Sequence, residues 1–472
     1  MKYATDTFDL IVIGTGVAAS TVAWKCHSAG WKTVIIDSRP FGGTCALRGC
    51  DPKKVLVGVA ELIDWNQRMQ NKGIRKGGRK NPNEDWHDLM EFKQTFTEPV
   101  PKDREESFSK AGITAFHGIA RFIDANTIRV TDKKNNKEHI IEGKNILIAT
   151  GARPAKLNIP GEEHVVTSDQ FLELEKLPKN ILFIGGGYIS FEFAHLAARF
   201  GSKVIILHRG EIPLAGFDPD LVKMLLKKTQ EIGINVKLLS TVKKIDYKAN
   251  GRRFVVYIST PGNTTNDAKE SEIVETDLVV HGAGRIPDTE NLALQEGGVE
   301  CDGVGGVKVN EYLQSVSNSA VYAAGDVAST DGIPLTPVAG YEGQIVAENL
   351  LKGNHSRPNY EGIPSVVFTI PPLASVGLHE NLARQRGLYF KTNYQDTSSW
   401  YSSRRIMESC SGYKVLIEET SNSILGAHVL GPHAEEIINI FALAIRLGLN
   451  ADKIKQGIFT YPTNSSDITY ML

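Results

Sequence analysis

The fold of this chain is decided by the stretch Phe8-Asp-Leu-Ile-Val-Ile-Gly-Thr-Gly-Val-Ala-Ala19. Its apolar first half predicts a buried strand, and Gly14 and Gly16 predict a tight turn that leads into an Ala-rich helix. A second apolar run, Thr33 to Ile36, follows the helix. A strand, a glycine turn, a helix and a strand within about thirty residues form the unit from which parallel sheets are built.

The same pattern occurs a second time. Ile181 to Ile184 predicts a strand, Gly185-Gly-Gly187-Tyr188 a turn into a helix, and Val204 to Leu207 the next strand. Pro364 to Thr369 and the residues beyond it alternate as short strands before a final amphipathic helix, Ile437 to Leu447. At 472 residues the chain is too long for one hydrophobic core. We therefore predict an α/β protein with two Rossmann-like domains and a C-terminal α+β domain.

The charge and apolar content exclude several classes of partner. Lys plus Arg (53) almost equals Asp plus Glu (54), so no overall field draws nucleic acid or an anionic membrane to the chain. No stretch reaches the ~18 uninterrupted apolar residues of a spanning helix. Leu10 to Trp24 follows acidic residues, unlike a signal peptide. A basic run at 72–80 is interpreted as a solvated loop. We expect a soluble cytoplasmic protein.

The residue that ends the second strand of each repeat predicts which nucleotide the repeat binds. Asp37 places a carboxylate where it can accept from both ribose hydroxyls, and it would repel a 2′-phosphate, which suits FAD or NAD. In the second repeat the strand ends in His208-Arg209. Arg209 can pair with a 2′-phosphate through its fork of donors, which favours NADPH over NADH. The alternative is an exposed basic pair after a strand.

Two cysteines lie close together in the segment Gly42-Gly-Thr-Cys45-Ala-Leu-Arg-Gly-Cys50-Asp-Pro-Lys-Lys54. A thiolate near a helix start and a lysine would have a lowered pKa, as thiol exchange requires. The alternatives are unpaired core cysteines or half of a zinc site, although no second cysteine pair completes such a site. The isolated Cys26, Cys301 and Cys410 are interpreted as buried small hydrophobic residues.

The cysteine segment resembles the redox motif of the class I pyridine nucleotide–disulfide oxidoreductases, such as glutathione reductase, dihydrolipoamide dehydrogenase and mercuric reductase. Five further motifs resemble this family in the family's order: Ala149-Thr150-Gly151, Gly284-Arg285-Ile-Pro287, Val321-Tyr-Ala-Ala-Gly325-Asp326, Pro364-Ser-Val-Val-Phe-Thr369 and Ala374-Ser-Val-Gly377. The resemblance covers nearly the whole chain. It implies an FAD-binding domain in two parts (1–158 and 283–353), an NAD(P)H-binding domain (159–282), a dimerisation domain (354–472) and a homodimer.

The resemblance also implies a path for electrons from NADPH through FAD to the cysteine pair and on to a small-molecule acceptor. Cys50 would be the thiol beside the flavin and Cys45 the outer thiol. Lys53 would sit beside the flavin and pair with Glu192, while Tyr188 would cover the nicotinamide site. The predicted cofactor contacts are, in chain order, Gly14, Gly16, Ala19, Asp37, Gly43, Thr44, Lys54, Thr150, Gly151, Gly185, Gly187, Tyr188, Arg209, Gly284, Arg285 and Asp326.

The C-terminal segment departs from the family. The disulfide reductases carry His-Pro-Thr, whose histidine reaches the partner's cysteines with the support of a glutamate, whereas this chain has Tyr461-Pro-Thr463 and Ser466. A phenol titrates near ~10 and an imidazole near ~6.5, so Tyr461 is a poor proton shuttle at neutral pH. As a catalytic residue it could stabilise a thiolate or a bound metal; the alternative is a packing tyrosine. Asp467 is a partial substitute for the missing carboxylate.

Three functions remain open at this point. The first is an FAD-dependent NADPH oxidoreductase with a redox-active Cys45–Cys50 disulfide that reduces a metal ion, a quinone or an unusual disulfide. The second is an orthodox disulfide reductase, resembling glutathione reductase, with a substituted proton donor. The third is a flavin-binding interaction protein with little turnover. A full mercuric reductase is not expected: the chain ends Ile468-Thr-Tyr-Met-Leu472 without a second cysteine pair, and no metal-binding module precedes Phe8.

Overall fold

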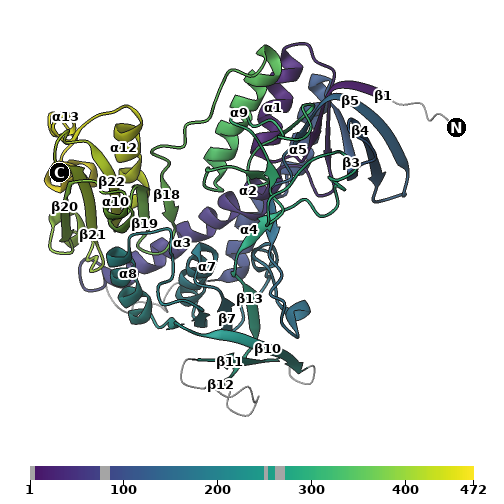
Figure 1. Cartoon of the computed structure of the whole chain (residues 1–472). Helices are drawn as coiled ribbons and strands as arrows, with labels where there is room; N and C mark the ends of the chain where they lie inside the picture. Colours follow the sequence, from purple (N-terminus) through teal and green to yellow (C-terminus); the bar gives the residue numbers. More distant parts are fainter. Residues whose placement is uncertain (1–5, 75–84, 249–252, 261–271) are drawn as a thin grey trace. The chain divides into compact units, whose positions relative to one another are not determined.

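The computed structural model describes residues 6–74, 85–248, 253–260 and 272–472, and most of the basic run at 72–80 lies outside them. The chain forms two compact units (Figure 1). Unit 1 comprises Met1–Lys53, Phe92–Ala155 and Arg285–Tyr360, and unit 2 comprises Lys54–Glu91, Lys156–Gly284 and Glu361–Leu472. The division into four domain segments stays a prediction.

Unit 1 alternates strands and helices. Its elements are β1 (Asp6–Ile13), α1 (Val17–Ser28), β2 (Thr33–Asp37), α2 (Gly43–Arg48), the start of α3 (Cys50–Arg68), the end of α4 (Trp86–Thr97), α5 (Val100–Ala111), β3 (Thr114–Phe122), β4 (Thr127–Asp132), β5 (Glu138–Ile148), β6 (Ala152–Pro154), β14 (Arg285–Pro287), β15 (Val307–Lys308), β16 (Val321–Ala323), β17 (Ala328–Ser329) and α9 (Thr336–Lys352).

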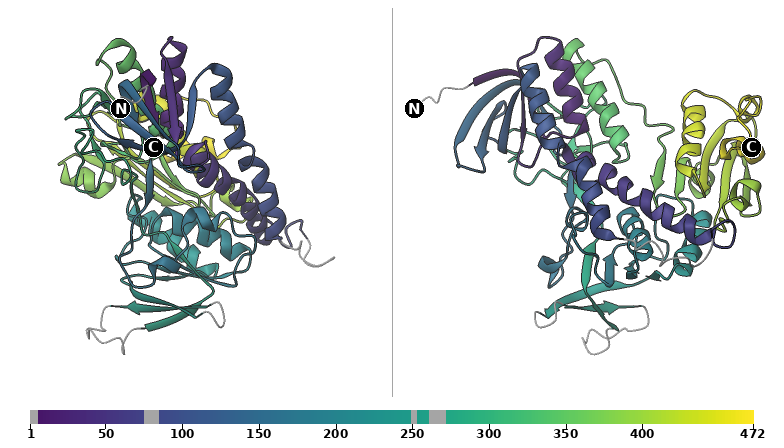
Figure 2. Two further views of the ribbon diagram at one scale, coloured as in Figure 1. Left: turned by 90° about the vertical axis from the view of Figure 1, so that its right-hand side faces the viewer. Right: turned by 180° about the vertical axis from the view of Figure 1, so that it is seen from behind.

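A parallel sheet forms the centre of unit 1. β1 pairs in parallel with β2 on one side and β5 on the other, and β16 lies beyond β5. The long strands β3 and β5 continue out of this sheet and pair antiparallel with β4. Leu10 to Ile13 of β1 are buried, as expected for a strand with neighbours on both edges and cover on both faces. Helices α1 and α9 lie side by side (Figures 1 and 2).

The elements of unit 2 include three further sheets and their helices. They are the rest of α3 and the start of α4, η1 (Glu162–His164), α6 (Ser168–Phe171), β7 (Asn180–Ile184), α7 (Tyr188–Arg199), β8 (Lys203–Leu207), α8 (Pro219–Glu231), β9 (Asn235–Lys237), β10 (Thr241–Lys248), β11 (Arg253–Ser259), β12 (Glu272–Thr276), β13 (Leu278–His281), β18 (Ser365–Val367), β19 (Leu373–Gly377), α10 (Glu380–Gln385), β20 (Phe390–Asp396), α11 (Tyr401–Arg404), β21 (Gly412–Glu418), β22 (Ile424–Leu430), α12 (Ala434–Arg446), α13 (Ala451–Lys455), η4 (Asn464–Asp467) and α14 (Ile468–Met471).

Unit 2 contains the second nucleotide-binding pattern and the C-terminal sheet. The strands β13-β7-β8-β9 form a parallel sheet in this order, and β10, β11 and β12 form an antiparallel one. The C-terminal strands pair antiparallel in the order β18-β19-β22-β21-β20, and α12 packs on β19 and β22. The predicted fold class, two Rossmann-like parts and a C-terminal α+β part, is confirmed.

The two glycine turns share one backbone conformation. Gly14 has a φ of 111°, and a Cβ there would lie 2.3 Å from the carbonyl oxygen of Ala149. Gly185 has a φ of 109°, and a Cβ there would lie 2.3 Å from the carbonyl oxygen of Gly282. Glycine alone meets both demands, because it tolerates positive φ and has no Cβ. The repeat in the sequence is thus a repeat of geometry.

The prediction for the isolated cysteines is correct for two and wrong for one. Cys26 and Cys410 are buried, but Cys301 is only partly buried. It packs against the edge of an apolar cluster of unit 1 and forms an isolated bridge to Val307, next to a turn that contains the exposed Val304. The error arose because burial at the end of a short bridge depends on the neighbouring turn.

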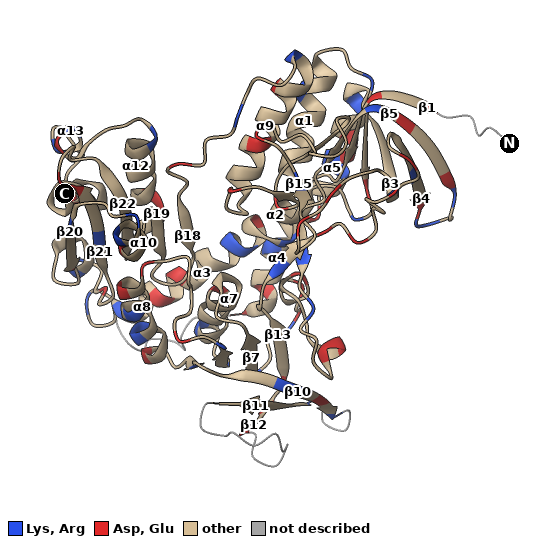
Figure 3. Cartoon of the chain, in the orientation of Figure 1, with Lys and Arg blue, Asp and Glu red and all other residues tan. Residues whose placement is uncertain are grey.

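Charged side chains of both signs are interspersed along the elements of each unit (Figure 3). This mixture agrees with the formal net charge of −1. Among the described residues, no helix is both long enough and apolar enough to cross a membrane.

A buried ion pair joins distant segments of unit 2. Nη2 of Arg199, the last residue of α7, donates to Asp64 Oδ1 of α3 at 2.8 Å and to the carbonyl oxygen of Ile370 at 2.9 Å. Nε of Arg68 donates to the other oxygen of Asp64 at 2.7 Å. Burial by itself would raise the pKa of Asp64, but the two guanidinium groups outweigh it and hold that pKa below its usual value. The ionised pair therefore stabilises the fold above pH ~4 and loses this effect as the pH falls through the lowered pKa.

We predict that Arg199→Met lowers the free energy of unfolding by about 3 kcal/mol at neutral pH, because Asp64 stays buried with half of its compensation removed. Urea unfolding of the full-length holoprotein measures the change. Arg405→Met, at an exposed arginine of the same unit, serves as the control and should change stability by less than about 0.5 kcal/mol. Equal effects of the two variants would contradict the role of this pair.

Candidate active site

Unit 1 brings the two neighbouring cysteines and one distant hydroxyl together. Cys45 lies in α2 and Cys50 is the first residue of α3, and both carry free thiols. The Cys50 Sγ lies 3.4 Å from Oγ1 of Thr336, the first residue of α9 and 286 positions away in the chain. The Cys45 Sγ lies 3.9 Å from Oδ1 of Asp51. The sulfur of Cys50 is thus close to the N-terminal ends of two helices, where a negative charge is stabilised.

The two thiols differ in acidity. The hydrogen bond from Cys45 lowers the pKa of Cys50 to about 6, against the opposing effect of burial, and the Thr336 hydroxyl and the Lys53 ammonium group lower it further. The same hydrogen bond, together with burial, raises the pKa of Cys45 well above its usual value. At neutral pH the reduced pair therefore consists of a Cys50 thiolate and a Cys45 thiol, which is the form needed for thiol–disulfide chemistry.

The predicted pair of Lys53 and Glu192 falls into different units. Lys53 ends the first segment of unit 1, and Glu192 lies in α7 of unit 2. Glu192 is buried, and its Oε1 accepts from the backbone N–H of Phe368 at 2.9 Å. The pairing of the two side chains stays a prediction.

Lys54, a predicted cofactor contact, belongs to unit 2. Its Nζ lies 3.6 Å from Glu61 and 3.8 Å from Glu435, measured to a carboxylate oxygen in each case. It also lies over the ring of Phe368, 4.6 Å from the ring centroid. Within unit 2 this lysine is thus held by two acids and an aromatic face.

The first glycine turn and the cysteine segment are packed together. Gly16 is the N-cap of α1, and a Cβ on Gly43 would lie 2.5 Å from the Cα of Gly16. Thr15 Oγ1 donates to Asp37 Oδ2 at 2.6 Å and accepts from the N–H of Gly42 at 3.2 Å. A Cβ on Gly16 itself would meet no described atom within 4 Å. The turn is therefore held from one side and open on the other, at a helix N-terminus that suits a pyrophosphate.

A second group of predicted contacts gathers around Asp326, which follows β16. Burial raises the pKa of Asp326, and the guanidinium group of Arg285 opposes this rise. Thr150 Oγ1 donates to the carbonyl oxygen of Asp288 at 2.7 Å, and the N–H of Asp288 donates to the carbonyl oxygen of Gly151 at 2.9 Å. Unit 1 thus supplies a glycine cradle, the Asp37 carboxylate and a second acid, a donor set that fits the pyrophosphate and hydroxyl groups of FAD.

Three further predicted contacts lie in unit 1 or directly before one of its strands. Ala19 is fully buried in α1, where its small side chain allows close packing of the helix. Thr44, in α2, is partly exposed next to Cys45. Gly284, the last residue of the middle segment of unit 2, has a φ of 111° and directly precedes β14 in the chain. Their contacts with a cofactor stay predictions.

At the second glycine turn, in unit 2, the two basic residues that follow β8 have different surroundings. Gly187 is the N-cap of α7, and Tyr188, its first residue, is 50% exposed. A Cβ on Gly186 would lie 2.5 Å from the ring of His208, so this ring packs on the turn. Arg209 follows it and is exposed. Of the basic pair after β8, Arg209 is the exposed member, and its contact with a nucleotide stays a prediction.

The C-terminal segment shows where the departures from the family pattern lie. Tyr461 is 79% exposed on unit 2. Ser466 and Thr463 cap η4 reciprocally: Thr463 Oγ1 accepts from the N–H of Ser466 at 3.2 Å, and Ser466 Oγ donates to the carbonyl oxygen of Thr463 at 2.6 Å. Asp467 accepts from the hydroxyl of Ser402, and burial raises its pKa. Within unit 2, Ser466 is occupied by the local turn and Asp467 by Ser402.

Three residues near the site were missed in the sequence. Asp51 stands beside Cys50 in the quoted segment, and its acidity was a signal that could have been used. Thr336 and Glu342 gave no local signal because both lie in α9, far along the chain. Glu342 is buried; it accepts from the N–H of Gly325 at 2.7 Å and from Tyr360 Oη at 2.6 Å, and so shapes the turn before Asp326.

In the part of the chain that the structure describes, one group of side chains has the donor set of a metal site: Asp218, His379 and His428, in unit 2. A lysine already neutralises its carboxylate, because Nζ of Lys414 lies 3.1 Å from Asp218 Oδ2. Nε2 of His428 lies 3.1 Å from the carbonyl oxygen of Leu378. An ammonium group in this position repels a cation, so the group is interpreted as a buried ion-pair network.

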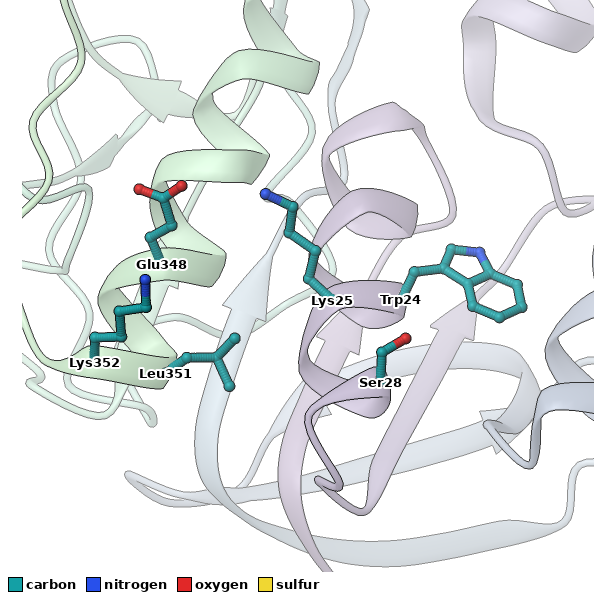
Figure 4. Close-up of a pocket in the computed structure, with 6 residues that line it drawn as sticks. All are labelled: Trp24, Lys25, Ser28, Glu348, Leu351 and Lys352. Carbon is teal, nitrogen blue, oxygen red and sulfur yellow. The ribbon is translucent and has the colours of Figure 1, made fainter.

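A surface hollow of about 400 Å³ lies between α1 and α9 (Figure 4). Lys25 points from α1 toward α9, which contributes Glu348 and Lys352, whereas Trp24 points to another side of α1. These residues lie in the C-terminal halves of both helices, whereas Gly16 and Thr336 lie at their N-terminal ends. The hollow is therefore separate from the cysteine site.

Comparisons with known proteins agree with this geometry. Residues 8–343 match the family described as pyridine nucleotide-disulphide oxidoreductase, and residues 363–472 match its dimerisation domain. Mercuric reductase of Staphylococcus aureus is 32% identical over 97% of this chain and 80% of its own length. Glutathione reductase of Burkholderia cepacia is 31% identical over 97% of this chain and 96% of its own length. A Cu(II) complex of the HOCl-induced flavoprotein disulfide reductase RclA from Escherichia coli superposes with a TM-score of 0.86 at 26% identity, covering 99% of both chains.

A two-domain nucleotide fold with a polarised cysteine pair defines a flavin-linked dithiol oxidoreductase. The chain belongs to the pyridine nucleotide-disulphide oxidoreductase family. It is accordingly an FAD-dependent oxidoreductase that uses a pyridine nucleotide, and it carries the family's dimerisation domain.

We predict that Thr336→Val raises the pKa of Cys50, because it removes the hydroxyl that helps to lower it. In the wild type the thiolate should persist at pH 7 and be lost as the pH falls through about 6. The thiolate–flavin absorbance of the reduced holoenzyme, titrated with pH, gives the midpoint. Thr336→Ser keeps the hydroxyl and should keep the wild-type midpoint; a Val variant with the same midpoint as Ser would refute the contact's role.

Proposed function

We propose that this protein is an NADPH-dependent flavoenzyme whose Cys45–Cys50 pair passes two electrons to an acceptor that needs no proton from an imidazole, in the first place a reducible metal ion. The asymmetric surroundings of the pair carry this proposal: the Cys50 Sγ lies 3.4 Å from the Thr336 hydroxyl at the start of α9, whereas the Cys45 Sγ lies 3.9 Å from the Asp51 carboxylate. These surroundings favour a Cys50 thiolate beside a Cys45 thiol in the reduced state. Tyr461, at the place of the family's histidine, supports an acceptor of this kind. The Cu(II) complex of the E. coli flavoprotein supports copper as the first metal to test.

The proposed reaction balances in two halves. FAD, when bound, would take a hydride from NADPH and deliver its two electrons to the disulfide. The S–S bond breaks, Cys45 takes up one proton, and Cys50 remains a thiolate held by Thr336 and Lys53. In the second half, two Cu(II) ions each take one electron, the disulfide forms again, and the proton of Cys45 is released to water. A quinone would instead take both electrons and two protons.

We further propose a homodimer formed through the dimerisation domain, with Tyr461 as the partner-facing residue of each chain. Its 79% exposure within unit 2 leaves the side chain available to a second copy. A second candidate function is reduction of a small disulfide, and the similarity to glutathione reductase of Burkholderia cepacia favours it. There Tyr461, Asp467 or water would have to supply the proton.

We predict that anaerobic titration with NADPH produces the long-wavelength thiolate–flavin absorbance, because Cys50 is the ionised thiol. Cys50→Ser should abolish this absorbance while the flavin is still reduced. Cys45→Ser keeps Cys50 but cannot form the disulfide. This variant should therefore show the band without prior reduction of a disulfide. Survival of the band in Cys50→Ser would refute the relay.

The same enzyme then identifies the acceptor. Steady-state turnover is compared with a Cu(II) chelate, mercuric ion, a quinone, glutathione disulfide and lipoamide. We expect turnover with the metal ions to exceed that with either disulfide. Brisk reduction of glutathione disulfide, accompanied by little metal reduction, would favour the second candidate function.

The preference for NADPH rests on Arg209. We predict that Arg209→Gln raises the KM for NADPH about tenfold, equal to about 1.4 kcal/mol, because the charged pairing with the 2′-phosphate is lost. The KM for NADH should change little. Lys203→Gln, at the other end of β8 and also exposed, is the control. A wild type that uses both nucleotides with equal kcat/KM would contradict the assignment.

A further inference from the structure

An exposed carboxylate lies beside the protonated thiol of the pair. Asp51 follows Cys50 in the first turn of α3, and its Oδ1 is 3.9 Å from the Cys45 Sγ, within reach of a weak S–H···O hydrogen bond. Asp51 is exposed, whereas Cys45 is only partly exposed. The carboxylate is therefore in contact with solvent as well as close to this thiol.

The other groups around the pair act differently. On the two helices that carry the thiols, the charged neighbours are Arg48 in α2 and Asp51 and Lys53 in α3. The positive charge of Lys53 stabilises the Cys50 thiolate, and α9 contributes only the neutral hydroxyl of Thr336. Of these neighbours, Asp51 is the one whose ionised side chain can accept a hydrogen bond from Cys45 but cannot donate one.

We propose that Asp51 is a positioning residue that holds the proton on Cys45 and so keeps the negative charge of the reduced pair on Cys50. This inference rests on the proposed function, because only a pair that cycles through the dithiol state needs its two thiols distinguished. A carboxylate accepts a hydrogen bond from a thiol but repels a thiolate, so its charge favours the protonated outer sulfur. The hydrogen bond with Cys50 and burial are the larger causes of the raised pKa of Cys45, and the negative charge of Asp51 adds to them. The same charge also raises the pKa of Cys50, so the distinction between the two thiols rests on the contact of Asp51 with the Cys45 Sγ.

A carboxylate beside the outer thiol acts differently from the imidazole that this chain lacks. An imidazole would exchange protons with the outer thiol near neutral pH, whereas the negative charge of Asp51 favours the protonated form of this thiol. The outer thiol then loses its proton only when an electrophile or a metal ion binds the sulfur and displaces it. Asp51 would thus suppress unproductive reactions of Cys45 between turnovers.

The test is the pH dependence of labelling at Cys45 in the holoenzyme. The protein is reduced with dithiothreitol, freed of reductant without oxygen and treated with iodoacetamide over a range of pH. Peptide mass spectrometry then gives the rate at Cys45 separately from that at Cys50. We expect Asp51→Asn to lower the midpoint for Cys45 by about one pH unit, equal to about tenfold faster labelling at pH 7.

Three further variants make the result decisive. Asp51→Glu keeps the charge and should restore most of the wild-type midpoint, whereas Asp51→Ser should reproduce the shift of Asp51→Asn with a smaller side chain. Glu98→Gln removes an exposed carboxylate elsewhere in unit 1 and should change nothing. An unshifted midpoint in both Asn and Ser variants, or a Glu variant that behaves like Asn, would overturn the proposal.

This outcome is separable from failure of the proposed function. The labelling assay uses neither NADPH nor an acceptor, so it reports on Asp51 even when no electrons reach the pair. A missing charge-transfer band with a shifted labelling midpoint would refute the relay and leave the role of Asp51 intact. A normal band with an unshifted midpoint would do the reverse.

Discussion

Gly43 and Gly16 touch backbone to backbone, since a Cβ on Gly43 would lie 2.5 Å from the Cα of Gly16. This contact places α2, and with it Cys45, directly against the turn that opens α1. Thr15 tightens the same junction by bonding to both Asp37 and Gly42. The nucleotide cradle and the thiol pair are therefore parts of one packed element, so a cofactor held by the turn is held at a set place relative to the sulfur atoms.

The electrostatics of the pair follow from where the helices begin. Cys50 is the first residue of α3 and lies 3.4 Å from the first residue of α9, so two helix N-termini favour its thiolate. Cys45, in the first turn of α2, faces the carboxylate of Asp51, and its hydrogen bond with Cys50 and its burial raise its pKa. Two chemically identical side chains thereby acquire opposite protonation states, and this asymmetry is the basis of the proposed division between a flavin-facing and an acceptor-facing thiol.

The C-terminal segment keeps the family's fold but not its acid–base pair. Ser466 caps η4, and Asp467 accepts a hydrogen bond from Ser402, so both side chains have hydrogen-bond partners within unit 2. Tyr461, by contrast, is exposed. The relatives of this chain include both a mercuric reductase and a glutathione reductase. In the proposed function, the change at position 461 accordingly falls on the acceptor side of the path.

The sequence by itself determined the two strand–turn–helix repeats, the fold class and the cysteine pair, because positive φ at Gly14 and Gly185 and runs of apolar residues are local demands on residue type. It also located Asp37 and Arg209 at the ends of matching strands. The tertiary structure alone decided that Thr336 meets Cys50 and that Glu342 braces the turn before Asp326, because these contacts join residues far apart in the chain. It likewise decided that His208 packs on its own turn while Arg209 remains exposed. The local pattern of apolar residues does not predict such contacts, because they depend on how whole helices and strands pack against one another.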